Sequence, residues 1–195
     1  MKLIGLSGTN GSGKDTIGHM MAERHGYLFV SLTDMLRREA TKRSLTLERE
    51  VLRTISAEWR REQGLGVLID KALEHLEELN ADYRGLVMAS LRNPGEADRL
   101  HQLGGTVIWV DAYSRTRYDR IQVNKAARGR AEEDDRTFEQ FIADEQAEMT
   151  SNGDSATLNM QGVRDKSDVT IMNDGSSIEA FKNQADRELT ELLSK

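Results

Sequence analysis

Cysteine is absent from the 195-residue sequence, and proline occurs once, at Pro94. The absence of cysteine excludes disulfides and thiolate metal sites. Aromatic residues make up only 5% of the chain, and no apolar run approaches the roughly 20 residues that a membrane-spanning helix needs. The first residues form no apolar signal region, since a strand pattern begins at Leu3. We therefore expect a cytoplasmic protein without a membrane partner.

An excess of positive charge is also missing. The chain has 27 Lys and Arg against 33 Asp and Glu, which gives a net charge of -6. A general nucleic-acid role is disfavoured because no surplus cations are present for a phosphate backbone, although local basic clusters can still bind a small anion. The length predicts one domain over residues 1–195. The sequence leaves open whether this domain is a monomer or a small homo-oligomer.

The most informative stretch is LIGLSGTNGSGKDTIGHMM, residues 3–21. A short apolar run precedes a glycine-rich turn and then apolar residues in helical spacing, which is the context in which G-x-x-x-x-G-K forms a phosphate-binding loop. Glycines let several backbone N–H groups point at one oxyanion, and the helix adds its positive N-terminal end. The residues expected to bind the phosphates of a nucleotide are Gly8, Asn10, Gly11, Ser12, Gly13, Lys14, Asp15 and Thr16.

The hydroxyl that usually follows the lysine comes one place later in this loop. Asp15 follows Lys14, and Thr16 follows Asp15. We expect Thr16 to face a magnesium-bound phosphate, and Asp15 to point outward and stabilise the first helical turn electrostatically. The sequence leaves open which of the two lies nearer the metal.

Five apolar segments alternate with helical patterns, at residues 3–6, 27–30, 86–89, 106–110 and 169–172. This alternation predicts an α/β fold with a five-stranded parallel sheet covered by helices on both faces. Amphipathic helices are expected within residues 43–79, a mobile segment at 125–135 and an irregular loop at 151–166. Ligands of such sheets bind at the carboxyl ends of the strands, so the residues after each strand are the candidates for chemistry.

Asp34 follows the second of these segments and has two open interpretations. Its carboxylate is placed to order magnesium waters or to accept a proton from the acceptor, and it is equally suited to cap the helix that begins there. Many phosphate-loop kinases have an acidic residue after the third strand, but this chain has Ala89 and Ser90. Asp34 or a water held by Ser90 is expected to replace that residue; otherwise catalysis is weak.

The Ser-Gly-Lys-Asp-Thr spelling at residues 12–16 resembles nucleoside monophosphate kinases of the adenylate kinase type, and so does Asp-Met-Leu-Arg at 34–37. The resemblance implies an ATP- and Mg²⁺-dependent kinase in which residues 43–79 form a helical acceptor-binding insert and residues 120–137 form a lid. It implies that Arg37 and Arg92 bind the acceptor phosphate and that Arg120 contacts the donor. It also implies that Arg128 and Arg130 close on the transferring phosphoryl group, and that backbone groups near Asp174 and Gly175 bind the donor adenine.

Other features resemble dephospho-CoA kinases, namely the aspartate after the second strand and the Asn-Asp-Gly turn at residues 173–175. Nearly the whole chain resembles an archaeal-type family of phosphate-loop proteins that is placed beside those kinases. A (deoxy)nucleoside monophosphate is therefore the leading acceptor, and dephospho-CoA is the second candidate. A third hypothesis is a nucleotide-binding switch with slow ATPase activity, which the missing carboxylate after the third strand favours.

Overall fold

The computed structural model describes residues 1–128, 134–150, 153–175 and 177–193. Its centre is a five-stranded sheet in the order β2-β3-β1-β4-β5, and every pair of neighbouring strands is parallel. The predicted α/β architecture is confirmed. The strands are β1 (Lys2–Gly8), β2 (Leu28–Ser31), β3 (Gly85–Ala89), β4 (Thr106–Asp111) and β5 (Val169–Met172).

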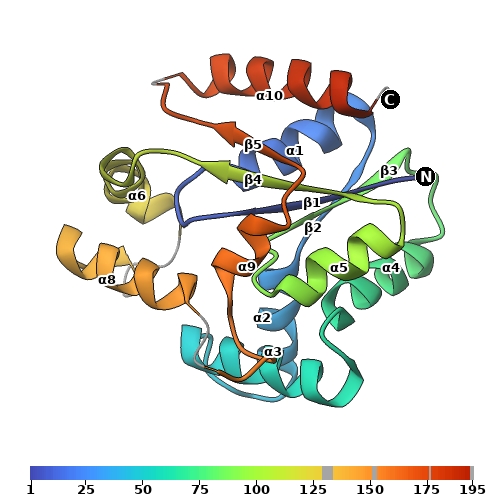
Figure 1. Cartoon of the computed structure of the whole chain (residues 1–195), viewed down its shortest axis with the longest axis horizontal. Coiled ribbons are helices and arrows are strands. Elements are labelled where there is room, and N and C mark those ends of the chain that lie inside the picture. The colour runs from blue at the N-terminus through green and yellow to red at the C-terminus, as the bar shows by residue number, and fades with distance from the viewer. Residues whose placement is uncertain (129–133, 151–152, 176, 194–195) are drawn as a thin grey trace.

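Helices cover both faces of this sheet (Figure 1). One face packs on α1 and α10 through a core that includes Ile17 and Phe181, and the other face packs on α2 to α5 and α9 through a core that includes Leu36 and Leu68. The helices are α1 (Lys14–His25), α2 (Leu32–Lys42), α3 (Arg49–Gln63), α4 (Val67–Leu79), α5 (Pro94–Gln102), α6 (Ser114–Arg128), α8 (Phe138–Met149), α9 (Met160–Asp165) and α10 (Ile178–Leu193).

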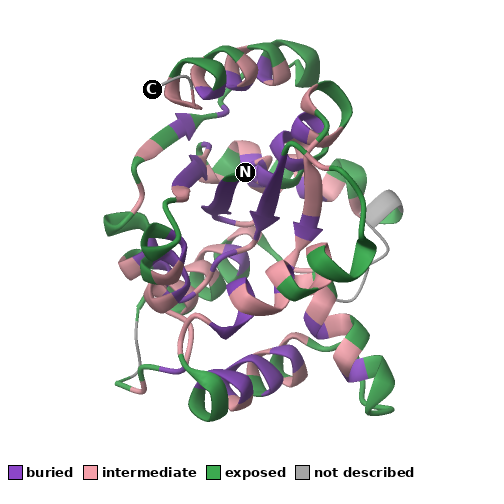
Figure 2. Cartoon of the chain, turned by 90° about the vertical axis from the view of Figure 1, so that its right-hand side faces the viewer, coloured by how far each residue is buried: buried purple, intermediate pink, exposed green. Residues whose placement is uncertain are grey.

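The central strands are buried because each has helices on both sides. All five residues of β3 are buried, and β1 is buried after its first residue. Figure 2 shows the buried residues concentrated in the sheet and on the helix faces that are turned toward it. Continuous apolar strands of this kind are typical of doubly covered parallel sheets, which explains why the sequence pattern located them correctly.

Two segments that were expected to be mobile or irregular are partly helical. Helix α6 continues through Lys125 to Arg128, so the first four residues of the segment expected to be mobile are helical, and their mobility stays a prediction. Lys, Ala and Arg are strong helix formers, which outweighs the lack of apolar anchors. Within the loop expected at 151–166, α9 begins after Asn159, whose side chain accepts a hydrogen bond from the Gly162 N–H at 2.9 Å. Met160 and Val163 bury one face of this short helix.

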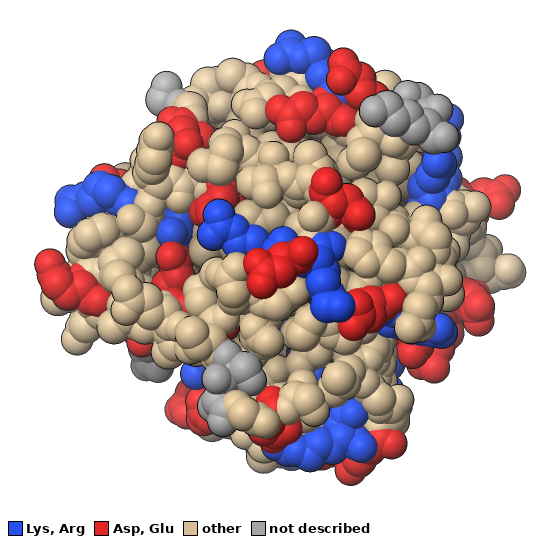
Figure 3. Space-filling model, in the orientation of Figure 1, with Lys and Arg blue, Asp and Glu red and all other residues tan. Residues whose placement is uncertain are grey.

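Helices α6 and α8 lie beyond the carboxyl ends of the strands, at the left in Figure 1. The surface seen in that orientation carries Lys and Arg interspersed with Asp and Glu (Figure 3), so positive charge does not gather over this face. Within the described ranges, no helix is both long and apolar enough to cross a membrane.

Candidate active site

A cavity of about 530 Å³ opens at the carboxyl ends of the strands. Its wall comes from the phosphate loop and the start of α1, from α2, α3, α4, α6, α8 and α10, and from the segments after β3, before α9 and after β5. Although the chain is acidic, the described residues that line this cavity include seven cationic side chains and only two carboxylates, those of Asp15 and Glu148. The cations are Lys14, Arg37, Arg49, Arg53, Arg60, Arg92 and Arg120. The cavity is therefore suited to a ligand with several negative charges.

Two glycines of the phosphate loop occupy positions that no other residue could take without strain. Gly8 has φ +140°, and a Cβ there would lie 2.0 Å from the Val110 carbonyl oxygen. Gly13 has φ +101°, and a Cβ there would lie 2.5 Å from Asn173 Nδ2. These close approaches bring the loop against β4 and the end of β5. The loop thereby presents Asn10, Gly11, Gly13, Lys14, Asp15 and Thr16 to the cavity. Gly8 and Ser12, which were also expected to bind the phosphates, are not among the residues that line the cavity.

A buried arginine holds the loop from its outer side. Arg117 on α6 is 3% exposed, donates from Nη1 to the Asn10 carbonyl oxygen at 3.3 Å, and donates from Nε to the Ala112 carbonyl oxygen at 2.8 Å. Its guanidinium also forms an ion pair with Glu145 on α8. Helix α8 is thus tied to the phosphate loop through one side chain.

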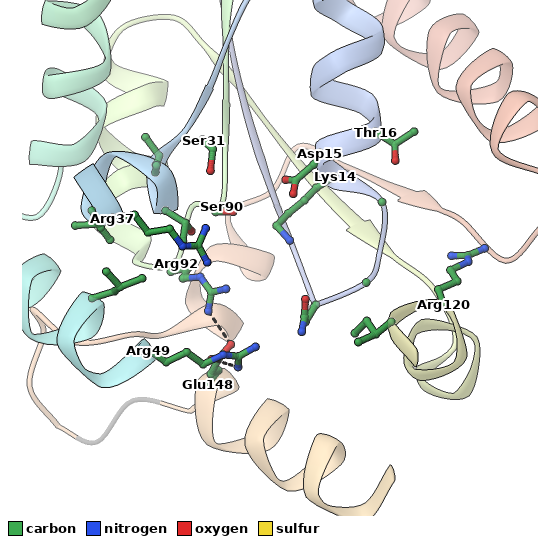
Figure 4. Close-up of a pocket in the computed structure, with 18 of the residues that line it drawn as sticks. Lys14, Asp15, Thr16, Ser31, Arg37, Arg49, Ser90, Arg92, Arg120 and Glu148 are labelled. Atoms are coloured by element: carbon green, nitrogen blue, oxygen red, sulfur yellow. Dashed lines mark hydrogen bonds and ion pairs between the residues drawn. The ribbon is translucent and has the colours of Figure 1, made fainter. Parts of the chain in front are cut away.

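The three residues after Gly13 point in different directions (Figure 4). Lys14, at the start of α1, is only 8% exposed and directs its ammonium group into the cavity. Asp15 lies on the side of α1 turned toward Ser31, whereas Thr16 lies on the opposite side. The expectation that Asp15 points outward was wrong, because its position on the first turn of α1 brings it to the cavity wall.

Asp34 and Arg37 lie on the first turns of α2. The Ser31 side chain caps this helix by accepting a hydrogen bond from the Asp34 N–H at 3.2 Å, so the capping role belongs to Ser31 and not to Asp34. The Asp34 carboxylate pairs with Arg37 at 2.7 Å and is 57% exposed. Arg37 lines the cavity, but Asp34 is not among the residues of its wall. The structure therefore does not bring Asp34 to the site where a catalytic or magnesium-ordering carboxylate is needed.

Arg92, which follows β3, belongs to a cluster that the sequence did not reveal. Its Nη1 lies 2.7 Å from one oxygen of Glu148 on α8, and the other oxygen of Glu148 lies 3.3 Å from Arg49 Nη1 and 2.8 Å from Arg53 Nη2. Three guanidinium groups from two elements thus share one carboxylate, which leaves the cluster with a net positive charge. Burial alone raises the pKa of Glu148, but the attraction of Arg92, Arg49 and Arg53 outweighs it and lowers the pKa from 4.5 to about 2.

This shift predicts a loss of stability in acid. The pKa of Glu148 is lower in the folded protein than in the unfolded chain, so its contribution, about 3 kcal/mol, is present above pH 4.5 and is lost as the pH falls toward 2. In Glu148→Gln this contribution is missing, and the free energy of unfolding is expected to fall less steeply between pH 5 and pH 2 than in the wild type. Urea unfolding at pH 6, 4 and 3 measures both slopes, and equal slopes would contradict the prediction.

A buried ion pair fixes the segment that carries Arg92. The Glu96 carboxylate accepts the backbone N–H of Arg92 at 2.7 Å and that of Asn93 at 3.1 Å, and it pairs with Arg60 on α3 at 2.7 Å. The side chains of Arg60 and Glu96 are 1% and 0% exposed. Asn93 donates to the carbonyl oxygens of Ser155 and Thr157, which fastens residues 153–159 over the same turn. Arg92 therefore projects from a rigid base.

The opposite side of the cavity is formed by α6 and the segment after β5. Arg120 donates from Nη2 to the Gly175 carbonyl oxygen at 2.6 Å and to Asn173 Oδ1 at 3.3 Å. Arg120, Asn173 and Gly175 all line the cavity. Asp174 does not, because its carboxylate accepts the Tyr113 N–H at 2.7 Å and so anchors the turn after β4. Figure 4 shows Arg120 and the pair Arg37 and Arg92 on opposite sides of Lys14.

The expected lid arginines lie at the limit of the described structure. Arg128 is the last residue of α6, and the position of its side chain is outside the description. Arg130 lies outside the described residues altogether. Their closure on a phosphoryl group stays a prediction.

A magnesium ion would need ligands beyond the protein. No group of three or more His, Asp or Glu among the described residues could hold a metal ion. Mg²⁺ in phosphoryl-transfer sites is bound by one or two protein groups together with substrate phosphates and water. The Thr16 hydroxyl on the cavity wall, beside the phosphate loop, fits that arrangement.

One protein family and several known proteins are similar to this chain in sequence. Residues 4–140 match the protein family described as an AAA domain. A UPF0200 protein of Pyrobaculum aerophilum is 28% identical over 194 residues, which cover 98% of this chain and 99% of that protein. A UPF0200 protein of Thermococcus kodakarensis is 26% identical over 197 residues and covers 99% of both chains.

Solved structures of kinases resemble the whole chain. Shikimate kinase from Bacteroides thetaiotaomicron has a TM-score of 0.59 at 15% sequence identity, with 100% of this chain and 99% of that chain covered. Shikimate kinase from Acinetobacter baumannii in complex with shikimate has a TM-score of 0.56 at 19% identity, with 100% and 94% covered. At these identities the likeness shows a phosphate-loop kinase-like fold.

Proposed function

We propose that this chain, which belongs to the AAA domain family, is an ATP- and Mg²⁺-dependent kinase acting on a small nucleotide-like acceptor. One observation carries the proposal: the cavity holds Lys14 between Arg120 on one side and the pair Arg37 and Arg92 on the other (Figure 4). The cavity thus has a cationic wall on each side of the phosphate-loop lysine. This arrangement suits a donor on one side and an acceptor on the other, which meet at the transferring phosphoryl group.

In the proposed reaction, most of the catalysis comes from positioning and electrostatics. The phosphate loop binds the donor phosphates through its backbone N–H groups and the start of α1. Lys14 offsets negative charge on the transferring group, and Arg120 with Gly175 contacts the donor nucleoside. When bound beside Thr16, magnesium would neutralise donor phosphate charge. Arg37 and Arg92 hold an anionic group of the acceptor, and the lid arginines Arg128 and Arg130 are proposed to exclude water.

The rest of the acceptor would lie against α2 to α4. Four leucines of these helices line the cavity, together with the polar Ser56 and Arg60 of α3. An acceptor that binds here would have an anionic group at the arginines and a less polar body against the leucines. A nucleoside monophosphate, the leading candidate, has both features, and so does the nucleotide end of dephospho-CoA. The four leucines are Leu32, Leu36, Leu52 and Leu68, and Leu158, just before α9, also lines the cavity.

Removing Arg92 tests the acceptor side. Arg92→Ala is expected to raise KM for the acceptor about 10- to 100-fold with a smaller change in kcat, because a charge-assisted contact made before and during transfer is lost. Initial rates at varied acceptor and saturating ATP separate the two constants. Arg187→Ala, a change of the same type on the exposed face of α10, is the control. An unchanged KM in Arg92→Ala would contradict the assignment.

The kinase proposal is tested by ADP release from magnesium-ATP with a panel of acceptors: AMP, CMP, UMP, GMP, their deoxy counterparts and dephospho-CoA. One acceptor that raises the rate well above background supports a kinase. A flat panel would contradict it and favour the nucleotide-binding switch. In that case, no acceptor would raise the melting temperature beyond the shift given by a non-hydrolysable ATP analogue.

A further inference from the structure

The side of α3 that faces the cavity is cationic. Arginines of an amphipathic helix usually face solvent, but Arg49, Arg53 and Arg60 of α3 line the cavity. Glu96 neutralises Arg60 from behind the wall. Arg49 and Arg53 share Glu148 with the arginine after β3, and neither of them has a role in the proposed reaction.

One carboxylate does not neutralise the three guanidinium groups around it. Among the described residues of the cavity wall, Arg49, Arg53 and Arg92 stand against Glu148 alone at this point, which leaves an excess of two positive charges. Arg53 also lies 3.3 Å from Glu50, but the Glu50 side chain is 79% exposed and outside the wall, so water screens its charge. The excess charge is partly desolvated, because the Glu148 side chain is only 12% exposed.

This excess suits one kind of anion. Arginine stays protonated in proteins, and the pKa of Glu148, lowered to about 2, keeps its carboxylate ionised, so the charge of the cluster is constant near neutral pH. A carboxylate ligand would bring one negative charge. A phosphate monoester carries close to two at pH 7 and offers three oxygens, which guanidinium groups bind in pairs of hydrogen bonds. The phosphate monoester therefore matches the cluster in both charge and geometry.

The cluster lies on the acceptor side of the cavity. Figure 4 shows Arg49 and Arg92 directed at Glu148, on the same side of Lys14 as Arg37 and opposite to Arg120. The turn that carries Arg92 is fixed by its buried ion pair, so the cluster has a rigid base on one side. A group bound here would belong to the acceptor and not to the donor.

We propose that Arg49 and Arg53 are acceptor-binding residues that form, with Arg92, a subsite for the dianion of a phosphate monoester. This inference rests on the proposed kinase function and narrows the acceptor class. A nucleoside monophosphate has such a group. Dephospho-CoA does not, because its phosphates form a diphosphate that is linked at both ends.

Binding measurements test the subsite without depending on turnover. The phosphate loop is filled with a non-hydrolysable ATP analogue and Mg²⁺, and dissociation constants are then measured by isothermal titration calorimetry. The probes are AMP, CMP, UMP and GMP, the methyl ester of the phosphate of each, and inorganic phosphate. The best monophosphate is expected to bind at least about tenfold more tightly than its methyl ester, which has a single negative charge. Inorganic phosphate that binds as tightly as this monophosphate would overturn the assignment to an acceptor.

Two substitutions test the new residues. Arg49→Ala and Arg53→Ala are each expected to weaken binding of the monophosphate about tenfold or more and that of its methyl ester less, because a contact with the second negative charge is lost. Affinity for the ATP analogue is expected to stay within about twofold. Arg49→Lys and Arg53→Lys keep the charge and are expected to recover part of the loss, which a folding defect alone would not explain.

The matched control is Arg61→Ala on the same helix. Arg61 is 56% exposed and pairs with Asp154 outside the cavity wall, so its removal is expected to leave every dissociation constant unchanged. If the alanine variants at Arg49 and Arg53 weakened the monophosphate and its methyl ester equally, or not at all, these arginines would only hold α8 and the subsite would be overturned. The expected binding without turnover in the acceptor panel would contradict the kinase function and leave the subsite standing.

Discussion

Lys14→Ala is expected to lower kcat by about 10³-fold, which is the largest effect on activity expected of any single substitution. Lys14 is 8% exposed and directs its ammonium group into the cavity between the donor and acceptor sides. A fixed charge in a partly desolvated site stabilises charge that develops in the transition state far more than a solvated one does. Turnover with the identified acceptor at saturating ATP measures the loss.

The matched control for this change is Lys166→Ala. Lys166 lies outside the cavity wall and pairs with Asp98 on the surface. Its removal is expected to leave kcat and KM unchanged. If Lys14→Ala retained the turnover of this control, the phosphate loop would not be the site of transfer, and the proposed function would have to be abandoned.

Glu96→Ala is expected to reduce the free energy of unfolding by about 3 to 5 kcal/mol, the largest effect on stability. It leaves the guanidinium of Arg60 buried without its partner, and removing one member of a buried pair has a cost of this size. It also removes the acceptor of the Arg92 and Asn93 N–H groups. Urea denaturation at pH 7, monitored by tryptophan fluorescence, gives the free energy.

Two comparisons make this prediction specific. Asp98→Asn, on the same helix α5, breaks an exposed pair with Lys166 and is expected to change stability by less than about 1 kcal/mol. Combining Glu96→Ala with Arg60→Met removes the unpaired charge and is expected to recover part of the loss. A Glu96→Ala protein as stable as Asp98→Asn would show that the buried pair does not hold the turn after β3.

Local sequence was sufficient for the sheet and the phosphate loop. The strand segments are continuous apolar runs, and the loop is a contiguous set of glycines followed by Lys14, so both can be recognised within short stretches of the sequence. The resemblance to nucleotide kinases singled out Arg37, Arg92 and Arg120, and all three line the cavity, because each follows a strand or lies on the helix after it and parallel strands bring these positions to one edge.

Only the tertiary structure decided which charges meet in the cavity. Glu148 is 56 residues from Arg92 and 95 from Arg53 along the chain, and no local pattern indicates that α8 would lie beside α3. The same holds for Asp15 and Asp34. The sequence predicted that Asp15 points outward and that Asp34 lies near the metal or the acceptor, whereas the packing of the chain places Asp15 on the cavity wall and leaves Asp34 paired with Arg37 outside it. Periodicity and motif spacing fix backbone conformation locally, whereas the pairing of distant charges depends on how the helices pack.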